Sequence, residues 1–182
     1  KAFKIINEYD YNINNWFNKN SLSQKKTKVV KLRYGENPHQ KGSFHSVDII
    51  GNEKYKQISG KKLSYNNIND IDSAINCLLD FKKPTSVIVK HASPCGVASN
   101  KTITKAFTNS YESDKTSAYG GILAVNREVD SQLAGKISKI FFEIVIGTGF
   151  TDNAIKILGN KKNLILIKTK NNIIRKEEQK SV

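Results

Sequence analysis

Apolar residues recur at helical spacing in two well-separated parts of the chain. Within residues 1–18 the aromatic and aliphatic positions follow one helical face, with Phe3, Ile6, Tyr9, Ile13, Trp16 and Phe17 on it. Residues 19–27 are polar and charged without periodicity, which predicts a linker. The clearest pattern lies in residues 69–81, where Asp70 and Asp72 stand near the expected N-terminus, a place that the helix dipole favours for carboxylates.

Short β-prone runs alternate with helical patterns over the rest of the chain. We expect strands at 29–34, 42–50, 85–89, 121–125, 143–146 and 164–167, and further helices at 102–112, 130–140 and 152–159. Pro94 to Gly96 is expected to form a turn, and the charge-rich tail after residue 167 is expected to fray. Apolar strands that alternate with helices predict an α/β fold, with helices on both faces of a mostly parallel or mixed sheet.

The composition narrows the class of protein. With 182 residues and 38% hydrophobic content, the chain can bury one sizeable core. It has no methionine and begins at Lys1, so we expect a piece of a longer polypeptide. The sequence shows neither a membrane-spanning apolar run nor a signal peptide, which predicts a soluble, cytoplasmic protein. Cys77 and Cys95 are then expected to be reduced and buried as small apolar side chains.

The formal charge of +14 is compatible with two classes of ligand. Basic patches gain affinity for nucleic acids by releasing counterions, and the same positive field would steer an anionic small molecule. The lysines are scattered along the chain rather than gathered in one stretch, which argues against nucleic acid.

Lys90 and His91 stand where the apolar run 85–89 ends, and in α/β sheets ligands collect at the carboxyl ends of strands. Successive strand residues point to opposite faces, so both can serve one site only if the chain leaves regular β geometry here. The alternative is a core histidine beside a surface lysine. A zinc site would need more ligands than His91, Cys95 and Cys77 offer, because the H-x-E and P-C-x-x-C pattern of zinc deaminases is incomplete, so we predict no metal.

Two loops add candidate binding groups. Arg33 and Tyr34, in the segment LRYGENPHQ, could hold a phosphate through the guanidinium and stack a ring, although the segment also fits an ordinary turn between strands. The segment SAYGG, residues 117–121, would let backbone N–H groups approach a ligand closely, but glycine pairs are common in turns.

Five segments together resemble one enzyme family. LRYGENPHQ, LSYNNINDIDSA, VIVKHASPCGVA, SAYGGILAVNREVD and FFEIVIGTGF occur in the order and approximate spacing of the bifunctional phosphoribosylaminoimidazolecarboxamide (AICAR) formyltransferase/IMP cyclohydrolases. The resemblance covers about residues 1–170. It implies that residues 28–182 form the first half of the transformylase region, a cytidine-deaminase-like three-layer α/β/α half-domain without catalytic zinc. Residues 1–18 would be the last helix of the cyclohydrolase domain, and 19–27 a linker.

The resemblance also implies an activity in de novo purine biosynthesis. The family moves a formyl group from 10-formyltetrahydrofolate to the 5-amino group of AICAR, giving FAICAR, and then closes the ring to IMP. The partners implied are AICAR, the folate cosubstrate and a second subunit in a homodimer, without a covalently bound cofactor, nucleic acid or membrane. The rest of the cyclohydrolase domain and the second transformylase half are absent from this sequence, so the chain is expected to be an inactive fragment.

Roles for individual residues follow from the same resemblance. The amine of AICAR is a weak nucleophile, so a base must remove its proton, and His91 suits this role because imidazole is substantially neutral at cellular pH. Lys90 would stabilise the tetrahedral oxyanion. The remaining matches are Arg33 and Tyr34 as nucleotide contacts, Asn67 as a ligand-binding amide, Gly120 as a backbone contact and Glu143 as an acidic contact.

The sequence departs from the family pattern in two places. Ile146 to Gly149 replaces the usual Ile-Ala-Pro and small residue, which would loosen that turn, and Tyr119 stands where phenylalanine is common. Two other functions stay open at this point. One is a nucleotide-binding or assembly module without catalysis, and the other is a basic nucleic-acid binder.

Overall fold

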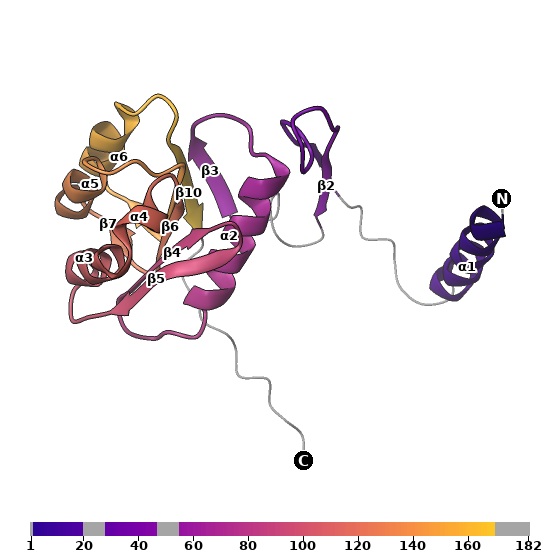
Figure 1. Cartoon of the computed structure of the whole chain (residues 1–182), viewed down its shortest axis with the longest axis horizontal. Coiled ribbons are helices and arrows are strands. Elements are labelled where there is room, and N and C mark those ends of the chain that lie inside the picture. Colours follow the sequence, from indigo (N-terminus) through magenta and orange to yellow (C-terminus); the bar gives the residue numbers. More distant parts are fainter. Residues whose placement is uncertain (1, 20–27, 47–54, 170–182) are drawn as a thin grey trace, which may run out of the picture.

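The computed structural model describes residues 2–19, 28–46 and 55–169 (Figure 1). Helix α1 (Ala2–Lys19) confirms the helix predicted at the start of the chain. A two-stranded antiparallel hairpin of β1 (Lys28–Lys31) and β2 (Ser43–Ser46) follows. Most of the predicted linker, the end of the expected strand 42–50 and the tail from residue 170 lie outside the described residues.

The central element is a six-stranded mixed sheet. Its strands, in spatial order, are β3 (Tyr55–Ser59), β10 (Ile165–Thr169), β8 (Ile144–Gly147), β6 (Ile122–Val125), β4 (Thr85–Lys90) and β5 (Ser93–Ser99). The strands β6, β8 and β10 run parallel, whereas β3, β4 and β5 each pair antiparallel with their neighbours. The short strands β7 (Glu128–Val129) and β9 (Gly149–Phe150) form a separate parallel pair.

Helices cover both faces of this sheet (Figure 1). One face packs against α2 (Tyr65–Leu78). The other packs against α3 (Ile103–Ser113), α4 (Lys115–Ala118), α5 (Ser131–Ile137) and α6 (Asp152–Gly159). The strands are apolar on both sides: Val87 and Val89 join the core under α2, and Ile88 joins the core on the opposite face. The result is a three-layer α/β/α arrangement, as the alternation of strands and helices predicts.

Helix α2 begins earlier than the sequence pattern predicts. Its N-cap is Ser64, whose hydroxyl accepts the Asn67 N–H, while the Asn67 amide oxygen accepts the Ser64 N–H, forming a capping box. Asp70 and Asp72 therefore lie beyond the first turn, and their interpretation as carboxylates at the helix N-terminus is wrong. The polar start of the helix, before Ile68, lacks the apolar periodicity on which the prediction relied.

The turn after β4 also differs from the prediction. Pro94 and Gly96 belong to the edge strand β5, and the chain reverses at His91 and Ala92 instead. Lys90 pairs with Ser93 across this two-residue loop. Both loop residues have positive φ, as in the tight turns typical of β-hairpins. Pro94 is compatible with an edge strand because one side of such a strand carries no ladder hydrogen bonds.

Within the described residues, no helix combines the length and the apolar character needed to cross a membrane.

Candidate functional site

The predicted site residues gather at one edge of the sheet. Val89 lies opposite Ile122 in the antiparallel pair, and Ile122 lies opposite Ile144 in the parallel pair. The carboxyl end of β4 therefore meets the amino ends of β6 and β8. Strand β4 runs antiparallel to β6 and β8. These candidate residues therefore lie at the carboxyl end of β4, as expected, but at the amino ends of β6 and β8.

The turn between β4 and β5 has an unusual backbone. His91 and Ala92 have φ of 53° and 59°, in the left-handed region that few non-glycine residues adopt. The backbone N–H of Ala92 donates to Asp70 Oδ1 at 2.6 Å, and its carbonyl accepts from Ser73 Oγ at 2.8 Å. Side chains of α2 thus satisfy both polar groups of one strained residue.

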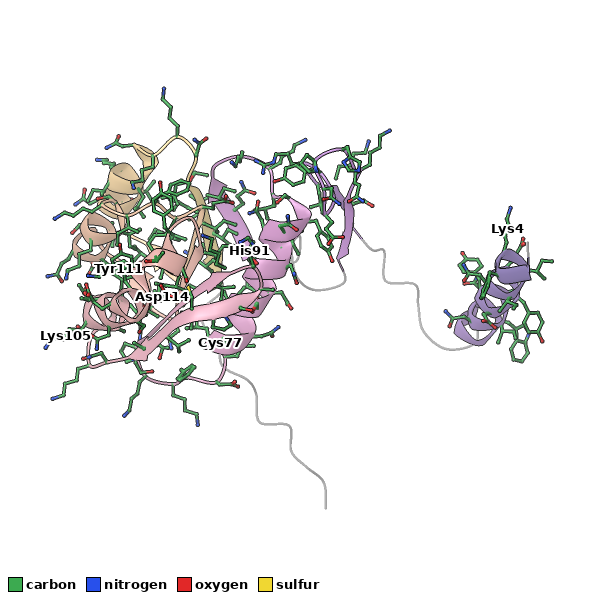
Figure 2. All side chains as sticks on the ribbon, viewed as in Figure 1. Lys4, Cys77, His91, Lys105, Tyr111 and Asp114 are labelled. Atoms are coloured by element: carbon green, nitrogen blue, oxygen red, sulfur yellow. The ribbon has the colours of Figure 1, made fainter. Side chains whose placement is uncertain are left out.

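Asp70 links this turn electrostatically to the rest of the site. Burial raises the pKa of its carboxyl, while the hydrogen bond from Ala92 and the charge of His91 act in the opposite direction. Glu143 also interacts with this carboxyl and adds to the increase in its pKa. His91 itself is exposed in the turn of the β4–β5 hairpin (Figure 2).

Lys90 contacts the loop between α4 and β6. Its ammonium donates to the carbonyl of Tyr119 at 2.8 Å. Gly120 has φ of 75°, which favours glycine, and its N–H donates to the carbonyl of Phe141 at 2.8 Å. Glu143 N–H donates to the Gly121 carbonyl at 3.0 Å, so this loop connects Lys90 to the start of β8.

Lys90 and His91 leave the end of β4 in different directions. Side chains along β4 alternate between the two faces of the sheet, so Lys90 lies on the same face as Ile88, the face that α3 and α4 cover. The Lys90 ammonium reaches the residue that follows α4, Tyr119. The chain leaves β geometry at His91, as a site shared by the two side chains would need, and His91 interacts with Asp70 of α2. A ligand that contacts both side chains would lie across the end of β4, and their shared role stays a prediction.

Asn67 connects the start of α2 to β8. This buried residue accepts the Ser64 N–H through Oδ1 at 3.1 Å and donates from Nδ2 to Glu143 Oε2 at 3.0 Å. Both ends of the amide are engaged within the protein. Its expected role as a ligand-binding amide is untested, while its contacts orient Glu143.

Arg33 and Tyr34 are tied to the same helix terminus. Arg33 N–H donates to the Leu63 carbonyl at 2.9 Å, and Tyr65 N–H donates to the Tyr34 carbonyl at 3.3 Å. The Arg33 guanidinium lies 4.7 Å from the centre of the Tyr34 ring and donates to its hydroxyl at 2.9 Å. Hydrogen bonds from Ser64 and Arg33 lower the pKa of the Tyr34 phenol. The loop is a turn between two strands, and it also carries these groups to the start of α2.

Comparison with known proteins gives the family. A family model described as the AICARFT/IMPCHase bienzyme matches residues 1–182. The chain belongs to this family. It is 50% identical over 150 residues to the bifunctional purine biosynthesis protein PurH of Acetivibrio thermocellus, a match that covers 81% of this chain and 29% of that protein. PurH of Anoxybacillus flavithermus is 47% identical over 154 residues, covering 83% and 30% respectively.

A longer match reaches more of the chain. PurH of Caldicellulosiruptor saccharolyticus is 44% identical over 181 residues, covering 92% of this chain and 35% of that protein. The chain thus spans about a third of the length of the curated relatives it matches. Among solved structures, RibD of Acinetobacter baumannii aligns with a TM-score of 0.42 and 16% identity, over 54% of this chain and 34% of RibD. That similarity is too low to carry an argument.

In this member of the AICARFT/IMPCHase family, the sequence patterns predict no site role for three residues that the structure places at the site. They are Ser64, Asp70 and Ser73, which contact Tyr34 and the turn after β4. A signal was present, because Asn67, Asp70 and Ser73 are polar and three positions apart, and so lie on one side of a helix. The dipole interpretation of Asp70 concealed this pattern.

The residues weighed as zinc ligands are separated in the structure. Cys77 lies toward the far end of α2 from His91 (Figure 2). The Cys95 thiol donates to the Ile88 carbonyl at 3.6 Å, and burial raises the pKa of both thiols. Within residues 2–19, 28–46 and 55–169, no three histidine, cysteine or acidic side chains are grouped so as to hold a metal ion.

Proposed function

We propose that this chain contributes the nucleotide-binding half of an AICAR formyltransferase in de novo purine biosynthesis. The enzyme transfers the formyl group of 10-formyltetrahydrofolate to the 5-amino group of AICAR, giving FAICAR. Ring closure of FAICAR to IMP belongs to a cyclohydrolase domain in the full-length protein. Family membership supports this function, together with the gathering of Lys90, His91, Asn67 and Glu143 at one sheet edge.

The architecture of the full-length protein is part of the same proposal. Residues 1–18 are the last helix of the cyclohydrolase domain, 19–27 are a linker, and 28–182 begin the transformylase region with a cytidine-deaminase-like fold. The exposure of Phe3, at 89%, and of the other apolar positions of α1 agrees with a helix whose packing partners belong to another domain. The full-length enzyme is a cytoplasmic homodimer that uses folate as a cosubstrate.

The single observation that carries the mechanism is that the chain leaves β geometry at His91, so that Lys90 and His91 both border the carboxyl end of β4 from its two sides. The amine nitrogen of AICAR attacks the formyl carbon, and the His91 imidazole accepts the amine proton. The resulting oxyanion is stabilised by the Lys90 ammonium, which the Tyr119 carbonyl orients at 2.8 Å. The intermediate then collapses, the bond between the formyl carbon and the folate nitrogen breaks, and that nitrogen leaves with the proton that His91 took from the amine.

The other groups hold the ribonucleotide. The exposed guanidinium of Arg33 is suited to the phosphate, because its planar fork pairs with two oxygens, and the stacked Tyr34 ring keeps it in place. Glu143, oriented by Asn67, accepts a hydrogen bond from the ligand. The loop at Gly120 borders the same strand ends, but the Gly120 and Gly121 N–H groups already donate to the carbonyls of Phe141 and Ala118, so this loop shapes the site rather than donating to the ligand.

Replacing the base tests this mechanism. In the full-length protein we expect His91→Ala to lower the rate of formyl transfer at least about a hundredfold, while cyclisation of added FAICAR persists. The matched control is His39→Ala, because His39 is an exposed histidine in the loop between β1 and β2. Formyl transfer that survives intact in His91→Ala would remove the proposed mechanism.

A nucleotide-binding module without catalysis is the second candidate, because the arrangement of Arg33 on Tyr34 could serve binding alone. The two candidates differ in one measurement on the full-length protein. A module binds AICAR without consuming 10-formyltetrahydrofolate, whereas the enzyme consumes it in step with FAICAR formation.

A further inference from the structure

We propose that Asp70 and Ser73 are positioning residues for His91, acting together by fixing the backbone of Ala92 from helix α2. Neither residue contacts substrate in this proposal. It rests on the proposed formyl transfer, because it assigns a role to residues that act through the base of that reaction.

The contacts of Ala92 carry the proposal. Asp70 and Ser73 are three residues apart on α2, so they present their side chains on one side of the helix. Asp70 Oδ1 accepts the Ala92 N–H at 2.6 Å, and Ser73 Oγ donates to the Ala92 carbonyl at 2.8 Å. A hydrogen bond to a carboxylate is stronger than one between neutral groups. The peptide groups on both sides of Ala92 are thereby held in one orientation.

The turn needs such support. Left-handed backbone is energetically unfavourable for each non-glycine residue that adopts it. His91 and Ala92 both adopt it, with φ of 53° and 59°. A turn of this kind persists only where its surroundings impose it, and β4 and β5 fix just its two ends. Without the contacts to α2, the turn would relax and the His91 imidazole would move.

Helix α2 is a rigid support for the contacts. Its apolar side is buried against the sheet, where Ile71, Ala74 and Ile75 are at most 5% exposed. The capping box at Ser64 fixes its first turn. Asp70 and Ser73 thus project from a helix that the core holds in place. Because α2 does not move with the turn, its side chains oppose any displacement of Ala92.

The first experiment measures formyl transfer in full-length variants. We expect Asp70→Ala to lower kcat about tenfold or more and Ser73→Ala about fivefold, because small misplacement of a catalytic group is costly. The KM for AICAR should change less than about threefold, since Arg33 and Tyr34 are unaffected. Asp70→Asn keeps an acceptor for the Ala92 N–H and should retain most of kcat.

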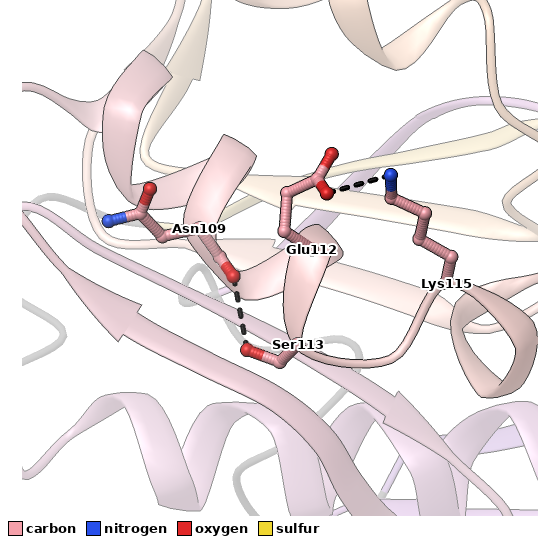
Figure 3. Close-up of polar contacts among 4 residues, drawn as sticks. All are labelled: Asn109, Glu112, Ser113 and Lys115. Atoms are coloured by element: carbon pink, nitrogen blue, oxygen red, sulfur yellow. Dashed lines mark hydrogen bonds and ion pairs between the residues drawn. The ribbon is translucent and has the colours of Figure 1, made fainter.

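Two variants serve as controls. Asp72→Ala removes an exposed carboxylate from the same helix. Ser113→Ala removes a hydroxyl that, like that of Ser73, donates to a backbone carbonyl, here that of Asn109 at 3.0 Å (Figure 3). Ser113 is an exposed residue at the end of α3, near the ion pair of Glu112 and Lys115. Both controls should leave kcat within about twofold, because neither side chain contacts the turn.

The second experiment asks whether Asp70 acts through His91. In the His91→Ala background, we expect Asp70→Ala to lower kcat less than about twofold further, since the group it positions is gone. Losses that multiply fully would overturn the proposal, as would Asp70→Ala and Ser73→Ala enzymes with normal kcat. If Asp70→Ala does not fold, Ser73→Ala decides alone. A normal rate in His91→Ala is a different result, because it contradicts the proposed function itself.

Discussion

Asn67 shows how one buried amide can organise several elements. At 5% exposure, it joins the N-cap of α2 to Glu143 just before β8. Removing a partner from a buried polar group costs more than the hydrogen bond is worth, because the remaining group stays desolvated. Asn67 therefore stabilises the fold in addition to any contact with a ligand.

Replacing Asn67 should lower stability. We expect Asn67→Ala to reduce the free energy of unfolding by about 1–3 kcal/mol, because Ser64 N–H and Glu143 Oε2 lose their partner. Urea unfolding followed by circular dichroism measures this change. Asn69→Ala, at an exposed position of the same helix, should shift it by less than about 0.5 kcal/mol. Equal stability of the two variants would show that the Asn67 amide contributes little.

At the level of single residues, the sequence predicts site groups whose residue type itself suggests acid, base or charge chemistry. Lys90, His91 and Glu143 were found because of the segments in which they stand, and the structure puts all three at one edge. Asp70 and Ser73 were missed because their partner is a backbone group in a turn far along the chain. Residue type alone does not reveal such a contact.

At the scale of elements, the packing of β5 on α3 is unusually close. A Cβ placed at Gly96 would lie 2.1 Å from the carbonyl oxygen of Ser110, a backbone atom that cannot move without displacing the helix. Glycine at this position lets the edge strand approach α3. The requirement is steric, because Gly96 does not have positive φ.

We expect Gly96→Ala to lower the free energy of unfolding by about 2–3 kcal/mol, because overpacking forces backbone shifts. Gly135→Ala is the matched control within α5, where an added Cβ meets no atom within 4 Å. Alanine there should raise stability by about 0.5–1 kcal/mol through its higher helix propensity. Thermal and urea unfolding of the two variants give the comparison. A Gly96→Ala protein as stable as the parent would mean that α3 moves freely away from β5.

The accuracy of the element predictions followed the strength of the local pattern. The helix predicted at 102–112 and the strand at 85–89 match α3 and β4 closely. The sequence predicts a turn where β5 lies, because this segment contains Pro94 and Gly96, but pairing with β4 makes it a strand. Strand β3 was missed because it is a partly exposed edge strand, paired with β10 far along the chain. Tertiary pairing of this kind is not visible in a short window.

At the scale of the whole molecule, the described residues contain every group assigned to the ribonucleotide. Arg33, Tyr34 and Glu143 meet around the start of α2, and the loop at Gly120 borders them. The groups that would bind folate are not among those assigned here. The curated relatives are about three times as long as the segment that matches this chain, and the proposed function assigns none of the described residues to folate.

Because the groups assigned to the ribonucleotide lie in the 182-residue chain and none is assigned to folate, we predict that this chain keeps AICAR binding but lacks formyl transfer. We expect the chain to bind AICAR, measured by titration calorimetry, without consuming 10-formyltetrahydrofolate. Affinity should fall about tenfold or more in Arg33→Ala and weaken with added salt, since the phosphate pairs with a charged group at the surface. Lys139→Ala removes one exposed positive charge elsewhere and should leave affinity within about twofold. Folate-dependent turnover by this chain alone would contradict this prediction. Tight, steeply salt-dependent binding of DNA or RNA, lost equally in both variants, would instead assign the charge of +14 to nucleic acid.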